Sequence, residues 1–324
     1  MLVAVNFHYV RPSFDAAYPS IHGLTPAQFE AQLKVLSRAG TFVSASQVRD
    51  RVRGGKLPER SILITFDDGL REQFEHALPV LKKLGVPALF FINTAPNIEG
   101  RVLTVHQIHL LRSVVSPVDF LAMLQRAAVA KGIELGGTVP SDLARAQYPY
   151  DTEEAARLKY LLNACLTEAQ RSVLADLCFA EVFPGRESAM ARDLYMNPEQ
   201  IRQLDGSIGS HTHAHLALGL IGEEAARSEI ESSMTHLEGW LGQRPFALSY
   251  PYGSREICTK RVGELTAAAG ADFAFTMERA VNRTFASPHH LTRIDCNDAP
   301  GGKSCNFGPE ELFDALPEPS WFPN

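Results

Sequence analysis

Cysteine is scarce in this sequence, and the few cysteines present form no pattern. The 324 residues include five cysteines, which are widely spaced and show no C-x-x-C motif. An odd number of scattered cysteines is not typical of a disulfide-stapled secreted domain. We therefore expect reduced thiols, as in a cytoplasmic protein.

Long apolar runs and a basic leader are absent as well. The N-terminus, MLVAVNFH, has no positively charged n-region and no sustained apolar stretch. No run of about 18 apolar residues occurs further along the chain. The sequence thus predicts neither a signal peptide nor a transmembrane segment, and we expect a cytoplasmic location.

The sequence also has no excess of positive charge. The net charge is −6 and the pI is near 6.0, which gives no electrostatic case for binding nucleic acid or an anionic membrane surface. The same acidity argues mildly against a highly acidic polymer as substrate. With 45% hydrophobic and 21% charged residues, the composition is that of a globular protein with a sizeable core.

Two short polar motifs lie far apart in the chain, each after a run that can form a strand. T-F-D-D-G at residues 65–69 follows the apolar run at 61–64, and the second motif, at residues 211–215, is H-T-H-A-H. Two carboxylates and three histidines supply the ligands of a divalent-metal site with an open position, and one carboxylate remains for proton transfer. His211 and His215 would share one face if their segment makes a helical turn, whereas the histidine between them would point elsewhere. The pair of motifs predicts a metal-dependent hydrolase.

These motifs resemble those of the polysaccharide deacetylase family, carbohydrate esterase family 4. The family's first motif, T-F-D-D-G, is matched at every position, and its second, H-[S/T]-x-x-H, is matched by His211, Thr212 and His215. A third motif, R-x-P-Y-G, is met in part by S-Y-P-Y-G at residues 249–253. The resemblance covers approximately residues 1–95 and 205–295. It implies a distorted seven-stranded (β/α) barrel.

Strand and helix signals alternate through the outer parts of the chain, which indicates a parallel sheet and an α/β fold. Motifs that follow three different strands point to the C-terminal rim of a barrel. We assign the barrel to residues 1–95 and 205–324. The expected strands lie at residues 2–7, 41–44, 61–66, 87–92, 207–210, 246–250, 273–276 and 291–294.

Residues 96–204 break this alternation. Helix signals at residues 105–115, 118–131 and 152–177 predict a largely helical insertion. The insertion could form a lid or one wall of the substrate cleft. It could equally pack beside the barrel or form a homo-oligomer surface, and the sequence leaves both possibilities open.

The resemblance also implies roles for individual residues. Asp68, His211 and His215 would hold one divalent metal ion, and Asp67 would be the general base. Zinc fits such a site best among the common metals, although cobalt, nickel or iron could occupy it. The backbone N–H of Tyr252 would stabilise the oxyanion.

The third motif departs from the family pattern, because Ser249 stands in place of the arginine that orients the base. Arg293, in the segment L-T-R-I-D at residues 291–295 that contains the last expected strand, is our candidate for the missing cation. Tyr250, Pro251 and Tyr252 are expected to line the sugar site, with Pro251 holding the loop in place.

The late L-x-x-H motif that supplies the catalytic acid in many family members is not visible. A leaving amine must be protonated, so some acid is needed. The candidates are five histidines: His109, His290, His8, His106 and His289.

The expected function is removal of an N-acyl group, most simply acetyl, from an amino sugar. A cytoplasmic location favours a nucleotide-linked or lipid-linked sugar, on its way into a surface polysaccharide, over finished cell-wall polymer. Removal of an N-formyl group or an O-acetyl ester would use the same chemistry in a pocket of different size. A barrel that binds carbohydrate without catalysis is the alternative of a different class.

Overall fold

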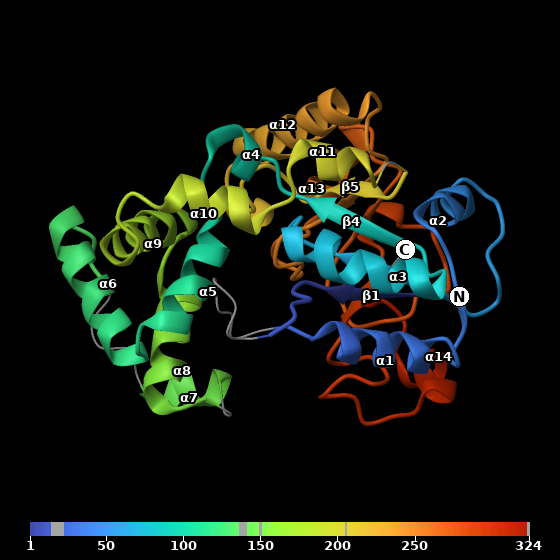
Figure 1. The fold of residues 1–324 in the computed structure, drawn as a ribbon, viewed down its shortest axis with the longest axis horizontal. Coiled ribbons are helices and arrows are strands. Elements are labelled where there is room, and N and C mark those ends of the chain that lie inside the picture. The colour runs from blue at the N-terminus through green and yellow to red at the C-terminus, as the bar shows by residue number, and fades with distance from the viewer. Residues whose placement is uncertain (14–22, 136–140, 149–150, 205, 323–324) are drawn as a thin grey trace. The chain divides into compact units, whose positions relative to one another are not determined.

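The chain forms two compact units. The computed structural model describes residues 1–13, 23–135, 141–148, 151–204 and 206–322 (Figure 1). Unit 1 consists of Met1–Ser13, His22–Glu99 and Ala191–Asn324. Unit 2 is built on Gly100–Met190. Residues 96–99 and 191–204, which the sequence analysis assigned to the insertion, thus belong to unit 1.

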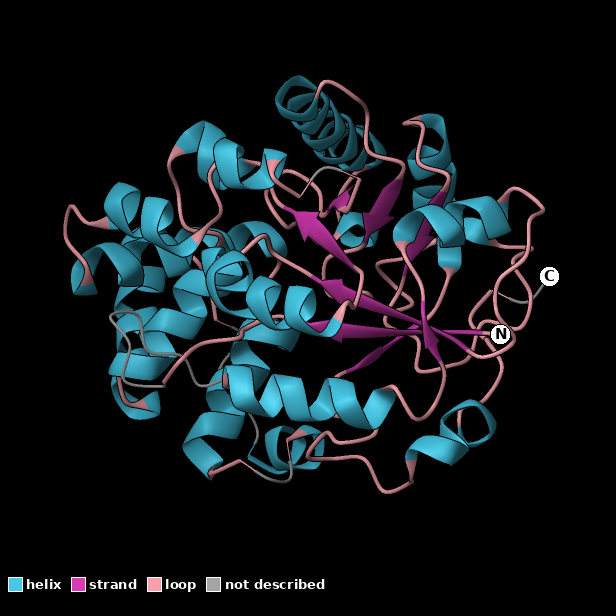
Figure 2. Cartoon of the chain, turned by 45° about the vertical axis from the view of Figure 1, so that its right-hand side comes forward, coloured by secondary structure: helices cyan, strands magenta, loops and turns pink. Residues whose placement is uncertain are grey.

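Unit 1 contains one parallel sheet that is almost closed into a barrel (Figure 2). Its strands are β1 (Leu2–Phe7), β2 (Thr41–Phe42), β3 (Ser61–Phe66), β4 (Ala88–Ile92), β5 (Ile208–Ser210), β6 (Ala247–Ser249), β7 (Phe273–Phe275) and β8 (Arg293–Asp295). Seven of them follow the order β7-β6-β5-β4-β3-β1-β8, and β2 pairs with β3 beside this path. A parallel bridge between Phe275 and Leu291 joins the two ends of the sheet. The predicted seven-stranded (β/α) barrel is confirmed.

The helices of unit 1 follow the strands along the chain. They are α1 (Pro26–Leu36), α2 (Ala45–Val52), α3 (Leu78–Leu84), α4 (Ala95–Glu99), α11 (Pro198–Arg202), α12 (Glu223–Leu241), α13 (Lys260–Ala268) and α14 (Leu312–Ala315). A π-helical turn at Gln73–Ala77 precedes α3, and 3-10 turns lie at Leu218–Leu220, Pro288–His290 and Pro309–Glu311. Local sequence sets their ends: Thr25 and Gln28 form a capping box at the start of α1, and Gly85 ends α3 at φ 66°.

Alternation along the strands decides which side chains point into the barrel. In β1, Val3 and Val5 belong to the core between sheet and helices, whereas Leu2 and Ala4 belong to an interior cluster. By the same period of two, Asn6 points inward near the C-terminal end of the strand. The inner side of this end is therefore where polar side chains meet.

Unit 2 is helical. Its helices are α5 (Thr104–Val114), α6 (Pro117–Lys131), α7 (Ser141–Gln147), α8 (Glu153–Tyr160) and α9 (Glu168–Val182), with a π-helical turn at Leu161–Cys165, and α10 (Glu187–Leu194) begins in this unit. The prediction of one helix over residues 152–177 is wrong. Leu166 is extended, and Thr167 caps a new helix through a capping box with Gln170. The role of the insertion as lid, cleft wall or oligomer surface stays a prediction.

Among the helices of the described ranges, none combines the length and the apolar character that crossing a membrane requires.

Candidate active site

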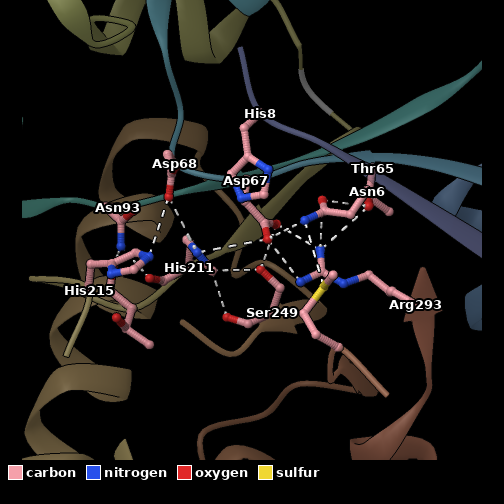
Figure 3. A network of polar contacts seen from close by, with 12 residues as sticks. Asn6, His8, Thr65, Asp67, Asp68, Asn93, His211, His215, Ser249 and Arg293 are labelled. Atoms are coloured by element: carbon pink, nitrogen blue, oxygen red, sulfur yellow. Dashed lines mark hydrogen bonds and ion pairs between the residues drawn. The ribbon is translucent and has the colours of Figure 1, made fainter. Parts of the chain in front are cut away.

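The first aspartate of the T-F-D-D-G motif points into the barrel. Asp67 directly follows β3, in which Leu63 lies in the interior cluster and Thr65 donates its hydroxyl to Asn6 Oδ1 at 3.1 Å. The alternation of the strand continues through Asp67, whose side chain is buried. Figure 3 shows it among polar side chains from several strands.

Four hydrogen bonds fix the carboxylate of Asp67. Arg293 donates from Nη1 to Oδ1 and from Nη2 to Oδ2, each at 2.8 Å. Ser249 Oγ donates to Oδ1 at 3.0 Å, and Asn6 Nδ2 donates to Oδ2 at 2.9 Å (Figure 3). Each carboxylate oxygen thus accepts two hydrogen bonds, and the group is held in one orientation.

Arg293 reaches Asp67 from β8 and is fully buried. Its guanidinium lies over the rings of Phe91 and Phe275, at 5.5 and 5.7 Å from their centroids. A buried cation needs a paired anion, and Asp67 supplies it in bidentate geometry. The structure therefore places Arg293 where a cation that orients the base is expected.

Opposing effects act on the pKa of Asp67. Burial by itself raises this pKa, because it removes the charged form from water. The positive charge of Arg293, the interaction with His211 and the hydrogen bonds from Arg293 together outweigh burial and lower it. The pKa of Asp67 is thus held well below its usual range, so the carboxyl group is ionised near neutral pH.

Asp68, His211 and His215 bring their ligand atoms to one point. Asp68 Oδ1 lies 3.5 Å from Nε2 of His211 and 3.5 Å from Nε2 of His215, and all three residues are buried. Ligands bound at about 2.1 Å with tetrahedral angles stand roughly 3.4 Å apart. Both separations are close to that value, and the three ligand atoms all lie within 4.8 Å of one another, so this set of donors could hold a divalent metal ion.

Ser249 orients the ring of His211. Nδ1 of His211 lies 2.8 Å from the backbone oxygen of Ser249 and 2.6 Å from its Oγ. Because a carbonyl can only accept, the proton of the ring belongs on Nδ1, and Nε2 presents its lone pair toward Asp68. Burial lowers the pKa of His211, against the opposing charges of Asp67 and Asp68, which favours the neutral ring that a metal needs.

The loop of the third motif packs against the second histidine ligand. The rings of Tyr252 and His215 meet edge to face with centroids 4.8 Å apart, and Tyr252 is 39% exposed. The next residue, Gly253, has φ 65°, and a Cβ there would come within 2.5 Å of Met277 Cγ. A glycine is therefore required at this turn, which holds the main chain of Tyr252 beside the ligand cluster.

The two ligand histidines converge through a loop. Residues 211–215 make no helical turn, and Thr212 and His215 have positive φ angles, so the condition under which the two rings would share a helix face is not met. His213 points elsewhere, as expected, and its ring nitrogens contact Thr94 Oγ1 at 2.7 Å and Glu99 Oε1 at 3.0 Å.

Non-glycine residues with a left-handed backbone conformation are concentrated at this site. Across the residues that the structure describes, positive φ in non-glycine residues occurs at Asp68 (77°), Thr212 (65°), His215 (61°) and Tyr252 (60°). Such conformations cost of order 1–3 kcal/mol each and persist only where the surroundings enforce them. Asp68 and His215, two of the three members of the ligand cluster, are among these residues.

Tyr250 and Pro251 are buried. Tyr250 belongs to a core cluster and donates its hydroxyl to the backbone oxygen of His289 at 2.9 Å. Because Ser249 points into the barrel, strand alternation turns Tyr250 toward the helices. Burial of Tyr250 and Pro251 gives no support to the expectation that their side chains line the sugar site, which stays a prediction, whereas Tyr252 is open to solvent.

Most of the candidate catalytic acids have described contacts with groups other than Asp67. Ring nitrogens of His289 and His290 are at 2.9 and 3.3 Å from backbone oxygens in the packing around α13. His106 and His109 belong to unit 2, where their ring centroids are 6.0 Å apart. These contacts give no support to a catalytic role for His290, and a role for His109 stays a prediction.

His8 is the candidate acid that the structure brings to the base. It directly follows β1, and its backbone oxygen accepts a hydrogen bond from Gln73 Nε2 at 3.0 Å. Its side chain is half-buried and interacts electrostatically with the carboxylate of Asp67 (Figure 3). A histidine in this position can exchange a proton with a group bound next to the base.

Asn6 is a site residue that the sequence analysis did not identify. Besides its contact with Asp67, its Oδ1 accepts from Thr65 Oγ1 and from Arg293 Nη1, both at 3.1 Å. The available signal was one amide within the otherwise apolar strand LVAVNF.

Comparison with known proteins identifies the family. The family model for polysaccharide deacetylases matches residues 54–136 and 187–274, which is more than half of the chain. The protein belongs to the polysaccharide deacetylase family.

Relatives and solved structures agree with this assignment. The poly-β-1,6-N-acetyl-D-glucosamine N-deacetylase of Staphylococcus aureus (strain MSSA476) is 34% identical over 103 residues, 28% of this chain and 36% of the relative. The protein of that name in Escherichia coli K12 is 32% identical over 90 residues, 27% of this chain and 13% of the relative. The matches therefore span much less than two thirds of these relatives.

Two solved structures share the fold. The Streptococcus pyogenes deacetylase PplD, in complex with acetate, aligns with a TM-score of 0.56 at 15% identity over 98% of both chains. IcaB from Ammonifex degensii aligns with a TM-score of 0.53 at 20% identity over 90% of both chains.

Proposed function

We propose that this protein removes the acetyl group from N-acetylglucosamine units by metal-dependent hydrolysis. The observation that carries the proposal is that the ionised Asp67 lies beside the ligand set. His211 Nε2 is 3.9 Å from Asp67 Oδ2 and 3.5 Å from Asp68 Oδ1. A carboxylate at this distance can act on a water molecule at the metal site.

Asp68, His211 and His215 would hold the metal ion, most simply zinc. When bound, a divalent ion supplies Lewis acidity, which lowers the pKa of water and stabilises negative charge on an acyl oxygen. Three protein ligands leave positions for water and substrate. The chain contributes a His211 ring whose tautomer Ser249 has already fixed.

Asp67 would accept the proton of the attacking water. Its low pKa keeps it ionised, and its orientation is fixed before the substrate arrives. Because its carboxylate already accepts four hydrogen bonds, one donor must turn away when the proton arrives. The hydroxyl of Ser249 can do so by rotation of its hydrogen alone.

Two further groups would complete the reaction. The backbone N–H of Tyr252 would donate to the acyl oxygen as negative charge develops there. His8 would give a proton to the leaving nitrogen, so that the C–N bond breaks with release of acetate and a free amine. The two proton transfers balance, because Asp67 gains the proton of water and His8 loses one.

The names of the relatives favour a polymeric or oligomeric substrate. Both relatives described above are named for poly-β-1,6-N-acetyl-D-glucosamine. We therefore rank β-1,6-linked N-acetylglucosamine chains first. The nucleotide-linked or lipid-linked sugar that follows from the predicted cytoplasmic location is the competing hypothesis.

Acetate release from a panel of sugars tests the proposal. The full chain, loaded with Zn²⁺ or Co²⁺, is given β-1,6-linked oligomers, β-1,4-linked oligomers and a nucleotide-linked N-acetylglucosamine, with matched N-formyl and O-acetyl sugars. We expect the fastest release from the β-1,6-linked oligomers. Faster release from the nucleotide-linked sugar would support the competing hypothesis, and metal binding without release from any sugar would indicate a non-catalytic barrel.

A further inference from the structure

The loop that carries two of the metal ligands has a strained backbone. In residues 211–215, Thr212 and His215 have φ 65° and 61°. Positive φ is a genuine outlier for a β-branched residue such as threonine, and each such residue costs of order 1–3 kcal/mol. Interactions from outside the loop must offset this cost.

Helix α12 contacts the N–H groups of this loop. Glu229 Oε2 accepts a hydrogen bond from the backbone N of Ala214 at 2.8 Å, and the backbone oxygen of Glu229 accepts from the N of His213 at 3.1 Å. One turn further on, Ser233 Oγ lies 2.7 Å from Ser210 Oγ. Two polar side chains four residues apart thus face the loop from the same side of the helix.

The end of β4 contacts the carbonyl groups of the same loop. Asn93 Nδ2 donates to the backbone oxygens of His211 and, at 3.3 Å, of Thr212. The backbone N of Ala95 donates to the oxygen of His213 at 3.0 Å. Helix α12 therefore binds N–H groups of the loop, and the segment at and after the end of β4 binds its carbonyl groups.

Glu229 is an unusual residue for the position that it occupies. It is 8% exposed, on a helix face whose other buried residues are Ala226, Ile230, Ser233, Met234 and Leu237. Burial of a carboxylate is costly unless hydrogen bonds compensate. The compensating backbone donor is Ala214, the residue immediately before the ligand His215.

We propose that Glu229 is a positioning residue for the metal centre. By holding the N–H of Ala214, its carboxylate keeps the following residue, His215, in the left-handed conformation that directs its ring to Asp68. Without this acceptor, a buried N–H loses its partner and the turn can relax. The inference rests on the proposed metal site, but it concerns metal affinity rather than turnover.

Glu229→Met and Glu229→Gln distinguish the effect of the hydrogen bond on metal binding from the effects of side-chain charge and volume. Both remove the charge at similar volume, but only glutamine keeps a side-chain oxygen that can accept from Ala214. Glu231→Met is the matched control, because Glu231 is a partly exposed carboxylate on the same helix, paired with Arg244. The probe is Co²⁺ alone, added to the full chain after treatment with a chelator.

We expect Glu229→Met to weaken Co²⁺ binding about 10- to 100-fold and to change the ligand-field absorption of the bound ion. Glu229→Gln should restore both the affinity and the spectrum to nearly those of the wild type, and Glu231→Met should change neither. Thermal unfolding in the presence of chelator verifies that each variant is folded. Where Glu229→Met does not fold, Glu229→Asp, which withdraws the acceptor by one methylene, should weaken binding in the same direction.

Two results would overturn the inference. Wild-type Co²⁺ affinity in folded Glu229→Met, or in Glu229→Asp where that variant replaces it, would show that Glu229 does not position the ligand. Equal losses in Glu229→Met and Glu229→Gln would show that the charge, and not the hydrogen bond, matters. Failure of the wild-type chain to bind Co²⁺ would refute the proposed metal site itself, which is a distinguishable outcome.

Discussion

Adjacent aspartates at the end of β3 are held in place by different means. Asp67 has no positive φ, and its side chain is fixed by four hydrogen bonds from Arg293, Ser249 and Asn6. Asp68 has φ 77°, and its side chain faces the rings of two histidines. The proposed base is thus positioned by side-chain hydrogen bonds, whereas the proposed ligand has a left-handed main-chain conformation.

The same difference distinguishes the two halves of the site. We call the residues around Asp67 the base half and the residues around Asp68, His211 and His215 the metal half. The base half combines residues in or directly after β1, β3, β6 and β8, which are strands of the barrel sheet. The metal half combines loops with left-handed residues, supported from α12 and from the end of β4. A substitution in one half should therefore change a different measurable property from a substitution in the other, and the predictions below test this separation.

The largest effect is expected from His215→Ala. This change removes one of three ligands without touching the barrel core, so we expect the protein to lose most of its bound metal and all measurable activity. Metal content per chain after dialysis, with circular dichroism as the check on folding, measures it. Full metal retention in the variant would show that His215 is not a ligand.

Asp67→Asn should show most clearly that the base half and the metal half affect different measurable properties. The amide cannot accept the proton of water, so turnover should fall about 10²-fold or more. Metal content should stay at the wild-type value, because the ligands are unchanged. Near-normal turnover would mean that the base has been assigned wrongly, and loss of the metal would mean that the halves are not separable.

Arg293→Met tests how the base half is stabilised. It leaves the buried carboxylate of Asp67 without its cation, and we expect a loss of about 3–5 kcal/mol in the free energy of unfolding. Arg279→Met is the control, because the pair between Arg279 and Asp298 is partly exposed, with N and O 3.9 Å apart, and should contribute about 0–1 kcal/mol. Urea unfolding of both variants in the presence of chelator gives the comparison; equal stabilities would contradict it.

The smallest effect concerns acid stability. The pKa of Asp67 is lower in the folded protein than its unfolded value of about 4, so the ionised carboxyl stabilises the fold at pH values above 4. This contribution is lost progressively as the pH falls below 4 toward the folded pKa. Metal-free wild type should therefore lose stability more steeply below pH 4 than Asp67→Asn does, which melting temperatures across that range can measure. Parallel curves would argue against the depressed pKa.

The barrel and the cluster of candidate metal ligands could be predicted from the sequence, because local patterns mark the strands and two short motifs resemble those of the family. Short apolar runs marked the strands, and β1 and β3 have the expected bounds. The two motifs named Asp68, His211 and His215, which the fold brings together. Arg293 could be proposed because the family motif has an arginine where this chain has Ser249, and a cation elsewhere in the chain could substitute for it.

What could not be predicted depends on contacts between distant residues. Asn6 is one amide in an apolar strand, and only the pairing of β1 with β3 and β8 shows that it contacts the base. In the sequence, Glu229 is one of several charged residues in a helix. Its contact with the loop is known only from the structure. The burial of Tyr250 follows from the direction of Ser249, which no motif specifies.

The position of Arg293 has a practical consequence for how the domain is delimited. The family match begins at residue 54 and ends at residue 274, so Asn6, His8 and Arg293 all lie outside it. A fragment cut to those limits would keep Asp68, His211 and His215, the cluster that could hold a metal ion. It would lose β1 and β8, and Asp67 would be without the charge that keeps it ionised and the amide that orients it. Inactivity of such a fragment would therefore say nothing about the whole protein.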